Sequence, residues 1–141
     1  MNEQSTIQFL NQFDFFNLTK SKETYSSYDA YDSNYLVEIK NRRKYYSDKL
    51  IECSKLFVNY QKATLERKKF LYVVTDEKGV WVYSISKHIE TIIKQRPIKI
   101  PCPSKTDFYG GKIINKYCYT LKEEISTELW NQHKYTTIQE K

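Results

Sequence analysis

The chain is poor in the residues that interrupt regular structure, with only 3 Gly and 3 Pro among 141 residues, against 13 Tyr and 7 Phe. Disordered and low-complexity chains are typically rich in Gly and Pro and poor in aromatic residues, so this composition excludes both classes. A folded core rich in aromatic side chains is expected instead. The length predicts a single domain over residues 1–141, which is large enough to bury a core without disulfide bonds.

Cysteine is also scarce, and Cys53, Cys102 and Cys118 form no CxxC spacing. An odd number of cysteines without a secretory signal predicts reduced thiols in a cytoplasmic protein, or in the host cell cytoplasm if the protein is viral, and disfavours a zinc site. No apolar run approaches the 18 residues of a membrane-spanning helix, so no membrane partner is expected.

Acidic residues are outnumbered: 23 Lys and Arg face 17 Asp and Glu, which gives a net charge of +6. This balance favours an anionic partner but does not by itself identify nucleic acid. A C-terminal extension over residues 94–121 is the most basic part, and aromatic residues lie among its lysines. That pattern suits contact with phosphates and unstacked bases, although solvated strand faces would have the same pattern.

A predicted β-hairpin at residues 28–40 carries the most informative polar residues. Turn-forming Asp, Ser and Asn at residues 32–34 separate two runs of aromatic and β-branched residues. With a two-residue loop, Asp29 lies opposite Glu38 on the partner strand. Strand alternation then places Lys40 on the same face as Glu38. The hairpin would therefore bring two carboxylates and an ammonium group together.

These residue types suit a divalent metal ion. Mg²⁺ or Mn²⁺ prefers oxygen ligands and takes few carboxylates, while water and substrate phosphates fill its other positions. Asp29 and Glu38 would supply the carboxylates, and the backbone carbonyl of Ile39 would be a third ligand. Lys40 would orient or deprotonate the attacking water. A solvated hairpin face with an Asp and a Lys–Glu pair is the alternative interpretation.

The same residues resemble the restriction-endonuclease-like, or PD-(D/E)xK, nuclease superfamily. The resemblance rests on Asp29, on Glu38-Ile39-Lys40 at the end of an apolar strand and on the basic residues that follow, and it covers residues 24–85. Tyr28 stands where the superfamily's name has proline. The resemblance implies a Mg²⁺-dependent endonuclease or exonuclease of small phage or mobile-element type, in which Lys40 is the catalytic lysine and the two carboxylates bind metal.

Apolar spacing predicts two helices that would flank the sheet. The first spans residues 3–16, and the second begins near residue 41 and continues towards residue 69 without a Gly or Pro. Its predicted buried stripe follows a helical rhythm. The stripe consists of Tyr46, Leu50, Cys53, Phe57 and Tyr60.

Three further polar residues are auxiliary candidates for the site. Glu52 and Lys55 lie three residues apart on the second predicted helix, and Glu3 lies in the first turn of the first. The resemblance implies that such helix residues can face the metal. A solvated stripe held by an ion pair accounts equally well for Glu52 and Lys55, and a frayed helix end accounts for Glu3.

The strands complete an α/β (α+β) fold. Residues 70–75 form a continuous apolar run, which predicts an interior strand parallel to strand 35–40. Residues 80–85 would return antiparallel after a short hairpin loop. The result is a central mixed sheet in β-β-α-β-β order flanked by helices, the core that the resemblance implies. Residues 113–121 are expected to complete a C-terminal β-hairpin.

The sequence thus predicts a metal-dependent nuclease that hydrolyses DNA phosphodiester bonds. The predicted nucleic-acid-binding residues are Arg42, Arg43, Lys44, Lys105, Lys112 and Lys116. Nothing resembles a reader helix, so structure-selective cleavage of junctions or flaps is one option that stays open. A chain with one active centre would need a homodimer to cut both strands together. The alternative is a non-catalytic basic nucleic-acid-binding protein on a degenerate nuclease fold.

Overall fold

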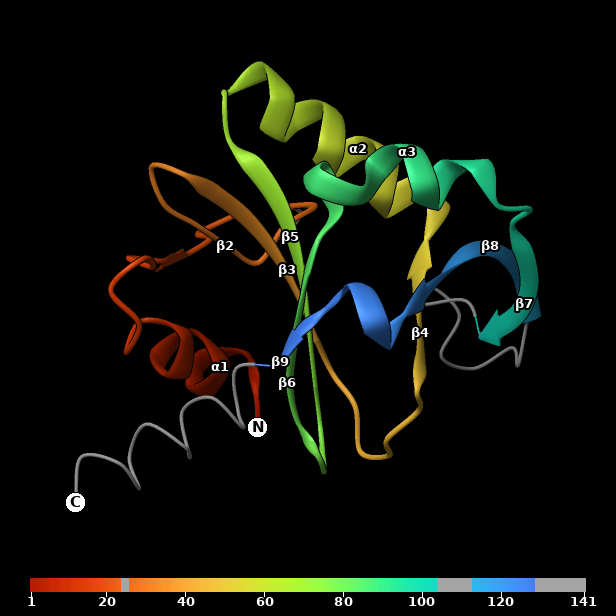
Figure 1. The fold of residues 1–141 in the computed structure, drawn as a ribbon, viewed down its shortest axis with the longest axis horizontal. Helices are drawn as coiled ribbons and strands as arrows, with labels where there is room; N and C mark the ends of the chain where they lie inside the picture. The colour runs from red at the N-terminus through yellow and green to blue at the C-terminus, as the bar shows by residue number, and fades with distance from the viewer. Residues whose placement is uncertain (24–25, 104–112, 129–141) are drawn as a thin grey trace.

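The computed structural model describes residues 1–23, 26–103 and 113–128. Its helices are α1 (Glu3–Leu10), α2 (Cys53–Leu65), α3 (Ile85–Lys94) and the 3₁₀ turn η1 (Glu123–Ile125). Its strands are β1 (Thr19–Lys20), β2 (Ala30–Tyr31), β3 (Tyr35–Asn41), β4 (Asp48–Glu52), β5 (Lys69–Asp76), β6 (Gly79–Ser84), β7 (Ile98–Pro103), β8 (Ile113–Lys122) and β9 (Thr127–Glu128). One sheet has six strands in the order β1-β2-β3-β5-β6-β9, and the other has three in the order β4-β8-β7 (Figure 1). The predicted α/β class is confirmed.

The register predicted for the first hairpin is also confirmed. β2 pairs antiparallel with β3, and Tyr31 lies opposite Leu36. The turn is held by Asp32, whose carboxylate accepts hydrogen bonds from the backbone N–H groups of Asn34 at 2.8 Å and Tyr35 at 2.7 Å. This is the local side-chain bonding that makes Asp a turn former. The side chain of Asp32 is therefore engaged in the turn.

The strands that follow α2 agree with the prediction. β3 and β5 are parallel, and β5 pairs antiparallel with β6 across the loop formed by Glu77 and Lys78. β7 and β8 are antiparallel, as the predicted C-terminal hairpin requires. The chain order departs from β-β-α-β-β in one respect, because β4 lies between β3 and α2.

The predicted helix over residues 41–69 is wrong in its first part. β3 continues to Asn41, and β4 pairs antiparallel with β8 before α2 begins at Cys53. Lys49 and Ile51 are buried alternately along β4, a period of two that the wider helical spacing concealed. The buried face of α2 is consequently different from the predicted stripe, and it consists of Leu56, Asn59 and Ala63.

The other two helices also differ from expectation. α1 ends at Leu10 because Asn11 caps the turn that follows: its side chain accepts a hydrogen bond from Leu18 N–H at 2.7 Å and donates one to the Leu18 carbonyl at 3.0 Å. Phe16 remains buried beyond the end of the helix. No helix was predicted where α3 lies, at the end of β6. No helix in the described part of the chain is long and apolar enough to cross a membrane.

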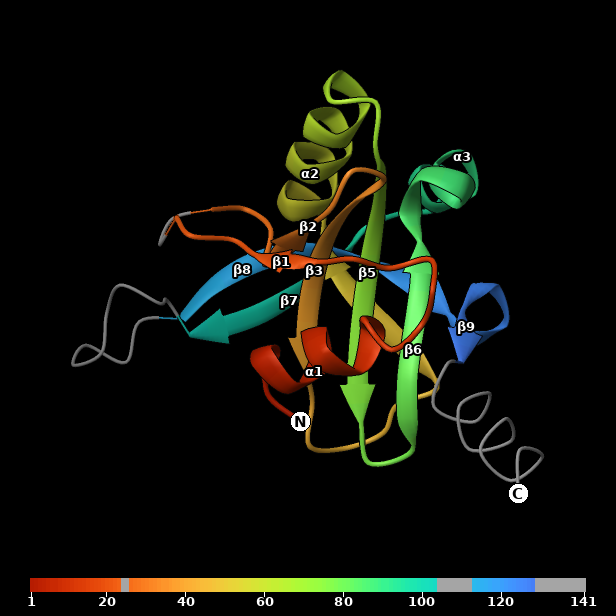
Figure 2. The same cartoon turned by 90° about the vertical axis from the view of Figure 1, so that its left-hand side faces the viewer.

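The six-stranded sheet separates two apolar cores. α1 lies against one face, and α2, α3 and the three-stranded sheet lie against the other (Figures 1 and 2). Alternate residues of β3 point to different cores: Val37 and Ile39 contact the core beneath α1, whereas Leu36 contributes to the core on the α2 side. The alternation predicted for this strand is therefore confirmed for its apolar residues.

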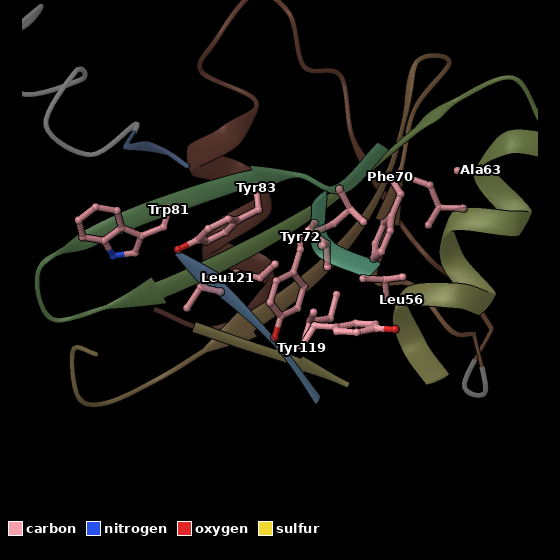
Figure 3. Packing of buried hydrophobic residues seen from close by; sticks show 13 residues of the cluster. Leu56, Ala63, Phe70, Tyr72, Trp81, Tyr83, Tyr119 and Leu121 are labelled. Atoms are coloured by element: carbon pink, nitrogen blue, oxygen red, sulfur yellow. The ribbon is translucent and has the colours of Figure 1, made fainter. Parts of the chain in front are cut away.

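The core on the α2 side is rich in aromatic residues. Figure 3 shows Tyr72 and Tyr83 of the six-stranded sheet extending towards Tyr119 and Leu121 of β8, with Leu56 of α2 beside them. The hydroxyl of Tyr72 donates a hydrogen bond to the Leu50 carbonyl of β4 at 3.0 Å. A buried tyrosine needs such a partner, so this bond couples the two sheets through the core.

A buried lysine makes a second connection between the sheets. The ammonium of Lys49 on β4 lies 3.7 Å from a carboxylate oxygen of Asp76 at the end of β5. It also lies over the rings of Tyr45 and Trp81, at 4.4 and 4.5 Å from their centroids, and donates a hydrogen bond to the carbonyl of Tyr46. These contacts compensate a charge that would otherwise be costly to bury.

The burial of α2 leads to a stability prediction. Leu56→Ala should lower the free energy of unfolding by about 2–5 kcal/mol, because Leu56 is 0% exposed and its loss leaves a cavity. Phe57→Ala should cost clearly less, since Phe57 is 47% exposed. Urea denaturation of both variants measures the difference. An equal or larger loss of stability for Phe57→Ala would mean that the stripe predicted from the sequence, which contains Phe57, is the buried face of the helix.

Candidate active site

Asp29 lies at the edge of β3, immediately before β2. Its backbone N–H donates to the Val37 carbonyl at 2.8 Å, and its carboxylate Oδ2 accepts a hydrogen bond from the Ile39 N–H at 2.6 Å. The N–H and C=O of one strand residue project to the same side of the strand. The Ile39 carbonyl therefore faces the edge at which the carboxylate of Asp29 lies.

Glu38 is a buried carboxylate on β3, with only 5% of the residue exposed. Its Oε1 accepts a hydrogen bond from the ammonium of Lys55 on α2 at 3.1 Å. Burial, followed by the negative charge of Asp29, raises the pKa of Glu38, while the charges of Lys55 and Lys40 oppose this rise. The carboxylates of Asp29 and Glu38 are thus close enough to repel each other, as the predicted pairing requires.

Glu3 approaches the same edge from α1. Asn2 and Ser5 form a capping box that fixes this first turn, with the Asn2 side chain accepting from Ser5 N–H at 2.8 Å. Burial and the negative charge of Asp29 raise the pKa of Glu3, although the charge of Lys20 at 3.7 Å opposes them. The charge of Asp29 thus acts on both Glu3 and Glu38.

Glu52 and Lys55 have different partners. Lys55 contacts Glu38, whose charge raises the pKa of the Lys55 ammonium despite the opposing effect of burial. Glu52 instead accepts a hydrogen bond from Lys116 on β8 at 3.0 Å. Burial disfavours the charged form of Glu52, but the hydrogen bond and charge of Lys116 outweigh it, and the pKa of Glu52 is lowered.

The candidate residues line two cavities. Glu38 and Lys40 line a cleft of about 490 Å³ between the two sheets, which we call the intersheet cleft. Asp29 and Glu3 line a smaller cavity of about 320 Å³ beside α1. Asp29 and Glu3 thus line the cavity on the α1 side, whereas Glu38 and Lys40 line the intersheet cleft.

The predicted nucleic-acid-binding residues divide by position. Arg42 and Lys44 line the intersheet cleft, and Arg43 is exposed but not part of its lining. Lys116 is engaged by Glu52. Lys105 and Lys112 lie outside the described residues. Of the basic residues at 42–44, Arg42 and Lys44 therefore line the cleft, and Arg43 does not.

The sequence interpretation missed the contribution of β4 to the cleft. Asp48 and Lys49 line it opposite β3, and Asp76 lies at its end. The sequence carries no apolar alternation that marks β4, because one of its two buried residues is Lys49.

Within the residues that the structure describes, no group of three or more His, Cys, Asp or Glu side chains is placed to hold a metal ion. Comparison of the chain with models of known protein families gives no match, and comparison with curated proteins gives no significant one. The groups that could bind a metal or take part in catalysis are therefore the two carboxylates, the Ile39 carbonyl and the neighbouring lysines.

The opposite pKa shifts of Glu38 and Glu52 predict opposite effects of pH. Between its ordinary pKa of 4.5 and its raised value, Glu38 retains a proton in the folded state that the unfolded state has lost. The free energy of unfolding of the wild type should therefore fall relative to that of Glu38→Gln as the pH rises above about 4.5.

Glu52→Gln is the matched control. Below its ordinary pKa of 4.5, Glu52 is more ionised in the folded than in the unfolded state, so the wild type should gain stability relative to Glu52→Gln as the pH rises towards that value. Urea denaturation between about pH 3.5 and 7 measures both slopes. Slopes of the same sign would contradict the assigned environments.

Proposed function

We propose that this protein is a Mg²⁺- or Mn²⁺-dependent nuclease that hydrolyses DNA phosphodiester bonds on a restriction-endonuclease-like core. The observation that carries the proposal is the hydrogen bond from Ile39 N–H to the carboxylate of Asp29. It directs two oxygen donors, the Asp29 carboxylate and the Ile39 carbonyl, to one edge of β3, and Glu38, whose charge interacts with that of Asp29, would supply a third. Parallel pairing of β3 and β5, with α2 between them in the chain, is consistent with such a core.

The donor set suits a hard divalent ion. Two carboxylates and a carbonyl are the few protein ligands that Mg²⁺ takes when water and phosphate complete its coordination. A cation beside Asp29 and Glu38 would also relieve the repulsion that raises the pKa of Glu38. When bound, the ion would supply a water of lowered pKa and stabilise charge on the leaving oxygen.

The remaining residues act on charge and proton position. Lys40 follows Glu38 on β3 and lines the cleft, which suits it to orient the attacking water or to accept its proton. Lys55 favours the ionised form of Glu38 through their contact at 3.1 Å. Arg42 and Lys44 would hold the phosphates of the DNA. One centre per chain cuts one strand, so cutting both together would require two copies.

A second function is favoured by one observation. Lys55 already satisfies a carboxylate oxygen of Glu38, so the buried charge is compensated by the protein itself. A degenerate nuclease fold that binds nucleic acid without cutting it would retain such a pair and the same basic cleft. The two functions differ in whether DNA is cleaved when Mg²⁺ or Mn²⁺ is added and protected when EDTA is present.

The register of the hairpin predicts which Asp is required. Asp29→Asn should eliminate Mg²⁺-dependent cleavage, whereas Asp32→Asn should leave most of it, because the Asn side-chain oxygen can still accept the turn hydrogen bonds made by Asp32. Cleavage of linear, branched and single-stranded DNA with Mg²⁺, Mn²⁺ and EDTA measures both. Loss in Asp32→Asn with retention in Asp29→Asn would move the metal to the turn. If the wild type cleaves none of these substrates with either metal, the binding function is the better explanation.

Lys40 should affect turnover rather than folding. Lys40→Ala is expected to reduce cleavage by about 100-fold or more, the usual consequence of losing an acid–base group, while the free energy of unfolding and Mn²⁺ binding change little. Lys99→Ala is the control, because Lys99 is exposed on β7 and does not line the cleft. Retention of more than a few per cent of wild-type cleavage, relative to that roughly 100-fold expectation, would remove the catalytic role of Lys40.

A further inference from the structure

Alternate residues of the segment that leaves β3 face the intersheet cleft. Lys40, Arg42 and Lys44 line it, whereas Asn41 and Arg43 do not. Arg42 remains beside β5, because its N–H donates to the Thr75 carbonyl at 2.7 Å. The backbone then bends at Arg43 and Lys44, so Lys44 lies on the turn that leads from β3 towards β4. Basic side chains from the end of β3 and from this turn therefore line the same cleft.

Most of the acidic residues that line the cleft are held in ion pairs. Glu38 pairs with Lys55, Glu52 with Lys116, and Asp76 with Lys49. Arg42, Lys44 and Asp48 also line the cleft. Within the described part of the chain, Arg42 and Lys44 take part in no ion pair. The cleft therefore presents positive charge along one wall.

The opposite wall and the floor are mainly apolar and are large enough for a base. They are formed by Leu50, Val74, Ile98, Ile100 and Cys118. A volume of about 490 Å³ lies within the range of sites that enclose a small organic group. Tyr46 is 62% exposed at the lining, where its ring is available for stacking on a base.

We infer that the intersheet cleft holds an unpaired nucleotide of a single nucleic-acid strand, with its phosphates along Arg42 and Lys44 and its base against Ile100. The inference rests on the proposed function for the class of polymer and goes beyond it by specifying the substrate as unpaired. A base inside a duplex is stacked and paired, so it reaches such a cleft only at the energetic cost of leaving the helix. Single strands and unpaired positions of branched DNA should therefore bind in preference to duplex.

The phosphate row is tested by binding in EDTA, which removes catalysis from the measurement. Fluorescence anisotropy would compare a labelled single-stranded oligonucleotide with the duplex of the same length. The wild type should favour the single strand. The double variant Arg42→Gln and Lys44→Gln should flatten the log–log salt dependence by about 1.4, or about 0.7 for each lost phosphate contact. Lys99→Gln, at an exposed position of β7 that does not line the cleft, should leave the slope nearly unchanged.

The base site is tested in the same assay by filling the cleft. Ile100→Trp should weaken single-strand binding by about 10-fold, because one base loses its contact surface. Ile113→Trp is the matched control, since Ile113 is 68% exposed on the adjacent strand and does not line the cleft. Urea denaturation of each variant confirms that it is folded. If Ile100→Trp does not fold, Ile98→Trp, at an exposed position of the lining, takes its place.

Tighter binding of duplex, an equal effect of Lys99→Gln, or an equal effect of Ile113→Trp would overturn the inference. Displacement of the oligonucleotide by polyglutamate as efficiently as by single-stranded DNA would also overturn it, in favour of an acidic polypeptide as the ligand. The outcomes are separable from those for catalysis. Single-strand binding without cleavage under Mg²⁺ or Mn²⁺ supports the cleft and rejects the nuclease, whereas metal-dependent cleavage with tighter duplex binding rejects the cleft and supports the nuclease.

Discussion

The burial of Glu38 is the constraint on which the rest of the site depends. A carboxylate in the interior is tolerated only when its charge is compensated. Lys55 provides this compensation from α2, and so fixes the position of that helix relative to β3. The same helix contacts the segment leading to Asp29, because the side chain of Asn59 donates a hydrogen bond to the Ser27 carbonyl at 2.9 Å. One buried charge thus links the helix, the sheet and the edge at which Asp29 lies.

Asp29 and Glu38 are held together although they repel. The fold places Asp29 through hydrogen bonds to the backbone of β3, at Val37 and Ile39, so its position depends on the sheet. A folded state that keeps two like charges close sacrifices stability, an arrangement that is common where function requires it. The same repulsion between the two carboxylates would favour the binding of a cation at this edge. Glu3, on the other side of Asp29, extends the same unfavourable environment to α1.

The second sheet and the face of β3 that carries Glu38 and Lys40 enclose the intersheet cleft. Lys49 and Tyr72 connect β4 to the six-stranded sheet through Asp76 and the Leu50 carbonyl, and Glu52 connects β4 to Lys116 of β8. These pairs use up acidic groups that would otherwise face the cleft. The same interactions that join the sheets therefore leave Arg42 and Lys44 as the dominant charges on the wall opposite β7. The ion pairs that hold the two sheets together thus also determine which charges line the cleft.

Local sequence chemistry was sufficient for the first hairpin, its register and the β5–β6 hairpin, because turn residues and strand alternation act over a few neighbouring positions. Asp32 sets the turn, and the pairing of Tyr31 with Leu36 follows from it. β4 was not predictable in this way, because it is a strand only through pairing with β8, and its Glu52 lies 64 residues from Lys116. The packing of distant elements likewise decided that Arg42 and not Arg43 lines the intersheet cleft. It also decided which residues pair with Glu52 and Lys55. Turns and alternation are written in adjacent residues, whereas a cleft between two sheets exists only after segments far apart in the chain have met.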